Sequence, residues 1–325
     1  MKIPTSQLSK SAAVKAPSNP VQRYTPWLYA FWKFSRPHTI IGTTLSVLGL
    51  YLIVLAQAPE PPGPSGLFAL SPFSLGLTLL ACLCGNVYIV GLNQLEDVAI
   101  DQINKPHLPL ASGEFSRRQG QVIVGIMGIL ALILAALGGI YLLGMVGLSL
   151  VIGTAYSLEP IRLKRHPFWA SLCILGVRGA IVNLGLFLHF RQGPPIPLPV
   201  WALTLFVLVF TFAIAIFKDI PDAEGDRRYN ISTFTLRLGQ KNVFNLARWV
   251  LTVCYLGMVF TASLGLPGVN PTFLMTTHLI GLGGLWWQSG QVNLQDKTAI
   301  SQFYQFIWKL FFLEYLVFPL ACLLA

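Results

Sequence analysis

Residues 73–101 read FSLGLTLLACLCGNVYIVGLNQLEDVAID. The first part of this stretch is apolar and long enough to cross a bilayer, whose hydrocarbon core needs about 20 apolar residues per helix. Its last part, the segment Asn93–Asp101, holds three acids in nine residues, although the whole chain contains only 12 Asp and Glu. A membrane-spanning run that ends in concentrated acid points to a function at that end.

The composition excludes an ordinary soluble protein. Only 10% of the 325 residues are charged and 54% are hydrophobic, whereas about 25% of a soluble domain is charged. Helices are the expected spanning structure, because each satisfies its own backbone hydrogen bonds in lipid. The sequence therefore predicts an all-α, polytopic membrane helical bundle with about nine transmembrane helices. The predicted spans cover about 38–57, 73–101, 120–137, 140–156, 168–189, 200–219, 243–264, 272–288 and 303–324.

A second acidic segment, Lys218–Asp226, follows the sixth predicted span and holds four more acids, so seven of the 12 acids lie in two short segments. On a helix, residues spaced i, i+4 and i+8 share one face, and like charges at that spacing repel. Such rows indicate a bound cation. The alternative is a pair of solvated helix ends with incidental acids, but the other loops carry almost none. The acids with this spacing, or one turn before it, are Asp97, Asp101, Asp219, Asp222 and Asp226.

Magnesium is the predicted cation, because it prefers oxygen ligands and commonly binds through one or two carboxylates and the phosphates of a substrate. Two facing rows of aspartates would hold more than one Mg²⁺ and bind a diphosphate between them. All five aspartates are predicted metal ligands, and the residues predicted to be catalytic are Asp97, Asp101, Asp222 and Asp226.

Cations and polar groups suited to the same ligand stand near these segments. For a single loop cation, lipid headgroups or membrane topology explain the charge equally well. Arg178 differs, because it lies inside an apolar run, and an ionisable residue within a span is a functional candidate by default. The predicted substrate-binding residues are Arg36, His38, Asn93, Lys105, Tyr156, Arg162, Lys164, Arg178, Asn183 and Lys218.

Domain organisation follows from the same apolar runs. Residues 1–30 are predicted to form a disordered basic tail, because residues 1–26 carry four basic side chains and no acid. Residues 31–325 are predicted to form a single membrane-embedded domain. One acidic segment ends span two and the other ends span six, which predicts two four-helix units plus a ninth helix. The segment Ala58–Pro64 is a predicted loop, given its proline content.

The distribution of basic residues predicts the orientation. With nine spans, 20 of the 22 Lys and Arg fall at one end of the bundle. Because cytoplasmic loops are enriched in Lys and Arg, the N-terminus and both acidic segments are predicted to lie on the cytoplasmic side.

At these residues the sequence resembles the UbiA-type membrane prenyltransferases. That family has an Asn-x-x-x-Asp-x-x-x-Asp motif at the end of its second span and an Asp-x-x-x-Asp motif at the end of its sixth. The chain matches them with Asn93, Asp97 and Asp101, and with Asp222 and Asp226. The resemblance covers nearly the whole chain from Trp32, because span number and motif placement also agree.

Longer signatures are similar to those of homogentisate prenyltransferases, above all the phytyl-transferring members of cyanobacteria and plastids. They are NQLEDVAIDQINKPHLPLASG (93–113), YSLEPIRLKR (156–165) and KDIPDAEGD (218–226). The resemblance implies Mg²⁺-dependent transfer of a phytyl group from phytyl diphosphate to homogentisate, with loss of CO₂. The product is 2-methyl-6-phytylbenzoquinol, a precursor of tocopherol. The sequence does not show which group binds the homogentisate carboxylate, and Arg178 is the candidate because it is an ionisable residue within a span.

Other functions stay open at this point. A solanesyl, geranylgeranyl or chlorophyll synthase-like prenyltransferase would share the acidic motifs. A multi-span transporter is the alternative from a different class, but its ionisable residues should lie near the bilayer midplane on broken helices. The expected partners are prenyl diphosphate, homogentisate and membrane lipid, with no nucleic acid and no obligate protein partner. The short tail favours the cyanobacterial type, in the plasma or thylakoid membrane.

Overall fold

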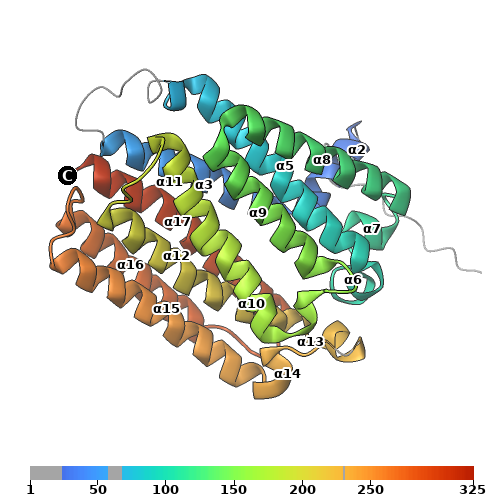
Figure 1. The fold of residues 1–325 in the computed structure, drawn as a ribbon. Coiled ribbons are helices and arrows are strands. Elements are labelled where there is room, and N and C mark those ends of the chain that lie inside the picture. The colour runs from blue at the N-terminus through green and yellow to red at the C-terminus, as the bar shows by residue number, and fades with distance from the viewer. Residues whose placement is uncertain (1–23, 58–67, 230) are drawn as a thin grey trace, which may run out of the picture.

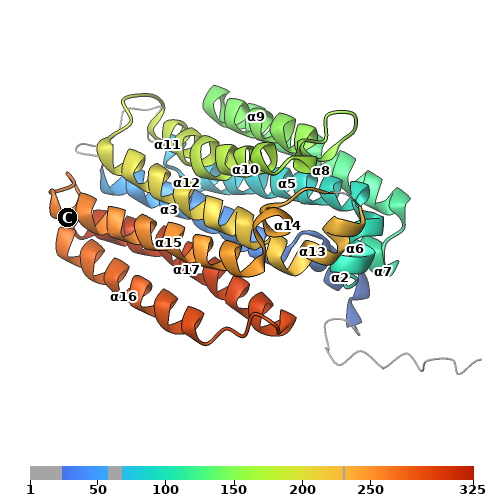
Figure 2. The ribbon, with the colours of Figure 1, turned by 90° about the horizontal axis from the view of Figure 1, so that it is seen from below.

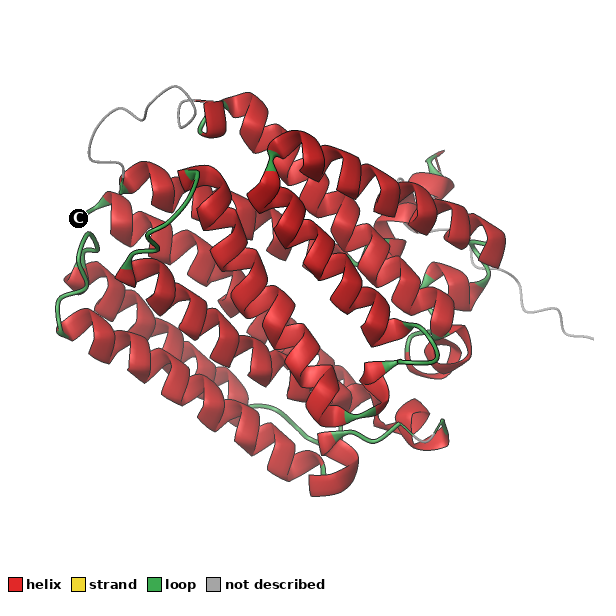
Figure 3. Cartoon of the chain, in the orientation of Figure 1, coloured by secondary structure: helices red, strands yellow, loops and turns green. Residues whose placement is uncertain are grey.

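The computed structural model describes residues 24–57, 68–229 and 231–325. Over these ranges the chain forms helices and no strand (Figure 3), which confirms the predicted all-α bundle. The long helices are α3 (Pro37–Ala56), α5 (Pro72–Glu96), α8 (Arg117–Gly138), α9 (Ile140–Ser157), α10 (Pro167–Leu175), α11 (Val182–Arg191), α12 (Leu198–Phe217), α15 (Gln240–Ser263), α16 (Pro271–Gly290) and α17 (Lys297–Leu323).

Short helices complete the described part of the chain. A π-helical segment, η2 (Gly176–Ile181), joins α10 to α11, so that residues 167–191 form one span with a widened middle. The remaining short helices are α2 (Pro26–Phe34), α6 (Val98–Asn104), α7 (Pro109–Ser112), η1 (Leu163–Arg165), α13 (Asp219–Arg228) and α14 (Phe234–Leu238).

Eight helical stretches among the described residues are long and apolar enough to cross a membrane, rather than the predicted nine. The predicted span that is missing from these eight is the one at 272–288, which corresponds to α16. This helix has 20 residues, but its polar and glycine residues make it less apolar than the other spans. It nevertheless packs against both α15 and α17 and lies beside them (Figure 2). The protein is an integral membrane protein.

Local sequence explains where several helices begin. Pro37, Pro72 and Pro167 occupy the first turns of their helices, where the missing N–H costs little. The turn between α8 and α9 requires Gly139, whose φ of 103° lies in a region that L side chains rarely adopt. The two helices that this turn joins, predicted as the spans 120–137 and 140–156, pack against each other.

The long helices are arranged as two groups closed by the last helix (Figure 1). In the first group α5 contacts α3, α8 and α9; in the second, α12 contacts η2 and α15, and α15 contacts α16. Helix α17 then contacts α16, α12 and α3, so it joins the end of the chain to its beginning. This agrees with the prediction of two four-helix units plus one. Helices α12 and α17 are the most buried candidate spans.

The predicted tail is partly wrong. Residues 1–23 lie outside the described residues, as does the predicted loop at 58–64. Residues 26–30, however, are helical and belong to α2. Phe34 at the end of α2 is fully buried and meets the ring of Phe115 at 5.8 Å. Helix α2 therefore packs through Ala30 and Phe34, which a count of charges does not anticipate, whereas Trp27 and Leu28 near its start are about half exposed.

Both acidic segments lie at one end of the bundle. Helices α6 and α13, which carry most of them, contact each other and lie with α7 and α14 at the end opposite the C-terminus (Figure 1). The segments are more than 100 residues apart in sequence, and the helical arrangement brings them together.

Candidate active site

A backbone contact joins the two acidic segments. The N–H of Gly225 in α13 donates to Asn104 Oδ1 at the end of α6, at 2.9 Å. A Cβ at position 225 would lie 2.5 Å from that oxygen, closer than atoms can approach. Glycine therefore allows the two segments to approach each other.

The first segment is not one straight helix. Helix α5 ends at Glu96, Asp97 has φ −110° and ψ 14°, and α6 begins at Val98. Helical hydrogen bonds nevertheless continue through the bend, from Asp97 N to Asn93 O at 3.1 Å and from Asp101 N to Asp97 O at 2.7 Å. The prediction that Asn93, Asp97 and Asp101 line one face of a regular helix is therefore wrong in detail, because the helix bends at its middle aspartate.

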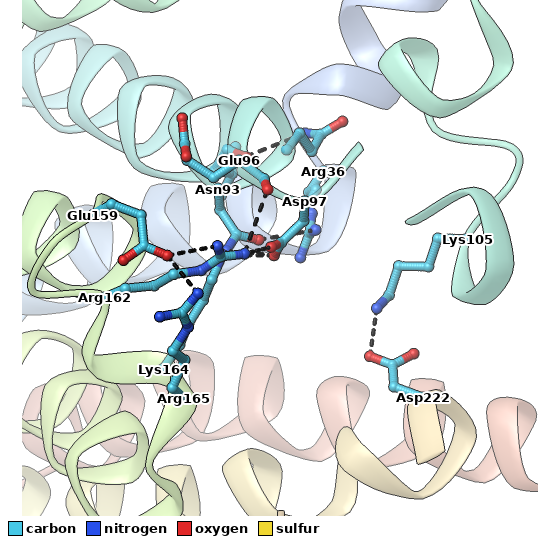
Figure 4. A network of polar contacts seen from close by, with 12 residues as sticks. Arg36, Asn93, Glu96, Asp97, Lys105, Glu159, Arg162, Lys164, Arg165 and Asp222 are labelled. Carbon is cyan, nitrogen blue, oxygen red and sulfur yellow. Dashed lines mark hydrogen bonds and ion pairs between the residues drawn. The ribbon is translucent and has the colours of Figure 1, made fainter. Parts of the chain in front are cut away.

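Asp97 is held by cations from the loop after α9. Its carboxylate oxygens lie 3.0 Å from Arg162 Nη2 and 2.7 Å from Lys164 Nζ (Figure 4). Asn93 Nδ2 also donates to Asp97, at 3.2 Å. Arg162 adopts φ 35°, a left-handed conformation that is strained for a non-glycine residue. Glu159 pairs with it at 3.0 Å, so the loop is fixed around Asp97.

Asp101 has an unsatisfied carboxylate oxygen within the acidic segments. The residue is only 5% exposed, and its Oδ2 has no hydrogen-bond partner among the described residues. Burial raises the pKa of Asp101 to about 6, against the opposing effect of Arg36 and Lys105. A buried carboxylate in this condition gains from a cation beside its free oxygen.

The second segment combines paired and unpaired acids. Asp219 pairs with Lys218 at 2.6 Å, and Asp222 pairs with Lys105 from the first segment. Figure 4 shows Lys105 reaching across to Asp222. Asp226 forms no ion pair with any described residue. Burial, followed by the nearby charge of Asp222, raises the pKa of Asp226 to about 7.

The acidic groups suit a hard cation but are not assembled around one point. Among the described residues, no three His, Cys, Asp or Glu side chains lie together as a ready metal cluster. Lysines occupy the space beside Asp97, Asp219 and Asp222 instead. The free Oδ2 of Asp101 and the unpaired Asp226 supply the oxygen chemistry that Mg²⁺ prefers. The residues therefore fit magnesium, provided that the lysines move toward an incoming anion.

A cavity of about 850 Å³ extends from the acidic segments into the bundle. Beyond the acids, its walls are mainly apolar and include Val146, Leu150, Ile174, Val177 and Ile214. The predicted substrate-binding residues that line it are Arg36, His38, Asn93, Lys105, Tyr156, Lys164, Arg178 and Lys218.

Two predicted substrate-binding residues do not line this cavity. Arg162 pairs with Asp97 and does not reach the cavity wall. Asn183 is fully buried elsewhere: its Nδ2 donates to Gly179 O and its Oδ1 accepts from the hydroxyl of Tyr315, both at 2.7 Å. The prediction for Asn183 as a substrate ligand is therefore wrong, because its polar atoms are already used between helices α11 and α17.

Replacing Asn183 with Ala is expected to affect stability rather than donor binding. The change leaves the Tyr315 hydroxyl buried without its acceptor, which should lower the free energy of unfolding by about 2 kcal/mol. Thermal unfolding in detergent measures the loss. The KM for the prenyl donor should stay within about twofold of the wild-type value. A tenfold rise in that KM at unchanged stability would contradict this assignment.

The last helix contributes residues that sequence analysis did not single out. Tyr304 and Trp308 of α17 line the cavity, and the ring of Trp308 contacts that of His38 in a tilted arrangement, with centroids 4.8 Å apart. Their spacing of four residues places them on one face of α17. The sequence contains this pair of aromatic residues at helical spacing, but such a pair on a membrane helix usually indicates ordinary packing and not a binding site.

Comparison with known proteins gives the family. The sequence matches the UbiA prenyltransferase family over residues 46–310. The chain belongs to the UbiA prenyltransferase family. It is 56% identical to the homogentisate phytyltransferase of Synechocystis sp., over 90% of this chain and 96% of that relative. Identity to homogentisate phytyltransferase 1 of Arabidopsis thaliana is 39%, over 90% of this chain and 75% of the relative.

Solved structures of UbiA proteins share the fold. A UbiA homologue from Archaeoglobus fulgidus bound to GPP and Mg²⁺ aligns with a TM-score of 0.61 at 15% identity, covering 91% of this chain and all of that one. The apo structure of a homologue from Aeropyrum pernix K1 aligns with a TM-score of 0.63 at 17% identity, covering 89% and 98%. As a UbiA family member, the chain is a transferase of prenyl groups, which decides against the transporter alternative.

Proposed function

We propose that this UbiA prenyltransferase transfers a phytyl group from phytyl diphosphate to homogentisate, releasing CO₂ and diphosphate. The product is 2-methyl-6-phytylbenzoquinol, for tocopherol synthesis. The observation that carries the proposal is the 56% identity, over 96% of its length, to a relative named homogentisate phytyltransferase. The site supports it chemically, since acids and cations meet at one end of a largely apolar cavity.

The acidic end is the proposed diphosphate site. Mg²⁺ bound by Asp97, Asp101, Asp222 and Asp226, with Asp219 beside them, would neutralise the diphosphate and stabilise the charge that it gains as it leaves. The archaeal homologue solved with GPP and Mg²⁺ is consistent with this use of a divalent metal.

Three lysines beside the aspartates can bind the phosphate oxygens of the donor. Lys105, Lys164 and Lys218 each pair with one aspartate and also line the cavity. Each carries three N–H donors, so an aspartate partner leaves donors free for phosphate oxygens. Cations placed where negative charge develops lower the barrier to bond cleavage.

The cavity walls protect the reaction that follows. The allylic C–O bond breaks, its electron pair leaves with the diphosphate, and an allylic carbocation remains among apolar side chains that exclude water. The electron-rich ring of homogentisate attacks this carbon. The ring proton that is lost balances the proton that the methyl carbon gains when CO₂ leaves.

Location and domain organisation extend the proposal. We infer that residues 31–325 act as one prenyltransferase domain in a cyanobacterial plasma or thylakoid membrane. The acidic segments would face the cytoplasm, which the bias of 20 of 22 basic residues to that end supports.

Product analysis with a panel of donors tests the proposal. Purified protein receives homogentisate, Mg²⁺ and one of three prenyl diphosphates: phytyl, geranylgeranyl or solanesyl. Phytyl diphosphate is expected to give at least about tenfold higher kcat/KM than the others, a difference of roughly 1.4 kcal/mol in transition-state binding. EDTA should abolish product formation. Preference for another donor would favour the second candidate, because relatives named homogentisate geranylgeranyltransferase and solanesyltransferase are 35% and 36% identical.

A further inference from the structure

Arg178 is a cation that the diphosphate chemistry does not use. It lies in the π-helical segment η2, in the middle of the span formed by residues 167–191, and lines the cavity. Its guanidinium carbon lies 4.9 Å from the ring centroid of Trp308 and 5.5 Å from that of Phe311. Arg178 forms no hydrogen bond or ion pair with any described residue. Local π-helix within an α-helix frequently marks a functional position.

The surroundings of Arg178 place it deeper in the bundle than the other cavity cations. The ring of His38 in α3 contacts that of Trp308 near the acidic end. Gly42, one turn further into the bundle along α3, is the residue beside Arg178: a Cβ there would lie 3.2 Å from Arg178 Nη1. Phe311, one turn beyond Trp308 on α17, contacts the same guanidinium. Arg178 therefore lies about one helical turn further from the acidic segments than the contact between His38 and Trp308.

The cations at the acidic end differ in their partners. Lys105, Lys164 and Lys218 are each neutralised by an aspartate, whereas the charge of Arg178 meets two aromatic faces and no carboxylate of any described residue. Aromatic faces attract a cation, but they accept few of the five N–H donors of a guanidinium. A charge within a membrane span is costly unless it is paired. The arrangement fits a site whose anion arrives with a substrate.

The chemistry of the substrates identifies that anion. This step rests on the proposed function. The diphosphate is matched by the metal and lysines at the acidic end, and the prenyl chain carries no charge. The one remaining anionic group is the carboxylate of the aromatic acceptor, whose planar shape suits the paired donors of a guanidinium.

We propose that Arg178 binds the carboxylate of the aromatic acceptor and so selects acceptors that carry one. Trp308 and Phe311 hold the guanidinium in place, and the acceptor ring then lies between Arg178 and the acidic end. In this position the carboxylate of the acceptor is held away from the carbon of the prenyl carbocation that the acceptor ring attacks.

Kinetics of Arg178 variants test the proposal. Arg178→Gln is expected to raise the KM for homogentisate about 30-fold or more, because it removes one partner of a desolvated charge pair. The KM for phytyl diphosphate should stay within about twofold. Arg178→Lys, which keeps the charge without the planar fork, should raise the homogentisate KM about tenfold. A purely structural role would move both KM values or lower stability without changing the KM for homogentisate.

A neutral acceptor analogue separates charge recognition from general damage. The methyl ester of homogentisate, used as a competitive inhibitor, lacks the carboxylate. Its inhibition constant should be the same in wild type and Arg178→Gln within about twofold, because the removed contact concerns only the charge. An equal weakening of ester and acid would overturn the proposal.

Arg248 provides a matched control. Its guanidinium carbon lies 4.3 Å from the ring centroid of Trp286 and 5.7 Å from that of Phe244, outside the cavity. Arg248→Gln removes the same kind of cation–aromatic contact and should leave both KM values unchanged. If wild type phytylates homogentisate and Arg178→Gln keeps its KM, only the assignment of Arg178 fails. If wild type gives no prenylated product with any donor, the proposed function fails as well.

Discussion

Asp226→Asn is expected to lower kcat/KM for prenyl transfer about 1,000-fold, while the protein still inserts and folds. Asp226 is buried, forms no ion pair with any described residue, and lies in the second acidic segment beside Asp222. Replacing its carboxylate with an amide removes a charge that the proposed metal needs. The loss of one group that stabilises developing charge typically costs 10²-fold to 10³-fold. Asp101→Asn should act alike, because that residue has the unsatisfied buried oxygen.

A neighbouring acid gives the control for this prediction. Glu224 lies on the same short helix α13, but its side chain is 70% exposed and pairs with Lys297 at 2.9 Å. Glu224→Gln changes the charge of α13 by the same amount and should leave kcat/KM within about twofold. Steady-state kinetics over a range of Mg²⁺ concentrations measures all three variants. Full activity of Asp226→Asn, or an equal loss in Glu224→Gln, would refute the assignment of the second segment.

Gly225→Ala is the second change with a large expected effect. The added Cβ would lie 2.5 Å from Asn104 Oδ1, so the Asn104 amide, which bonds α6 to α13, would have to move. Displacing catalytic groups by about 1 Å can cost about 100-fold in rate, so kcat/KM should fall by about that factor. The overall fold should remain, because the clash involves two short helices at one end of the bundle. Size-exclusion profiles and thermal unfolding in detergent check that the protein is intact.

A double variant tests the steric cause directly. Asn104→Ala removes the side chain that the new Cβ would meet, at the cost of the hydrogen bond to Gly225 N, and should lower kcat/KM about tenfold. The double variant should then resemble Asn104→Ala alone, since changes in contacting residues are not additive. Gly257→Ala in α15, where an added Cβ meets nothing within 4 Å, is the control and should be neutral. If the double variant instead loses kcat/KM by the product of the two single losses, a clash between the added Cβ at position 225 and Asn104 is not the cause.

The positions of the helices could be predicted from the sequence because the causes are local. A run of apolar residues becomes a membrane helix whatever its neighbours are, since lipid forces the backbone to bond within the segment. Helix α9 was accordingly predicted within one residue at each end. The acidic segments were found by the same kind of argument, because charge is rare in such a chain.

Which side chains share the cavity depended on packing. Asn183 and Arg178 lie within the same predicted span. Asn183 forms hydrogen bonds inside the bundle, whereas Arg178 lines the cavity. Trp308 escaped notice because its partners, His38 and Arg178, lie on two other helices. A periodic pattern gives the face of a helix but not which neighbour that face meets.

The sequence by itself thus determined a helical membrane protein with acids concentrated at two span ends. Only the tertiary structure decided how those acids are engaged: Asp97 by Arg162 and Lys164, Asp222 by Lys105, and Asp101 with an oxygen left free. The contact that sets their separation joins residues 121 apart in the chain. Ion pairs and close approaches of this kind depend on distances between helices, and a linear order of residues does not contain those distances.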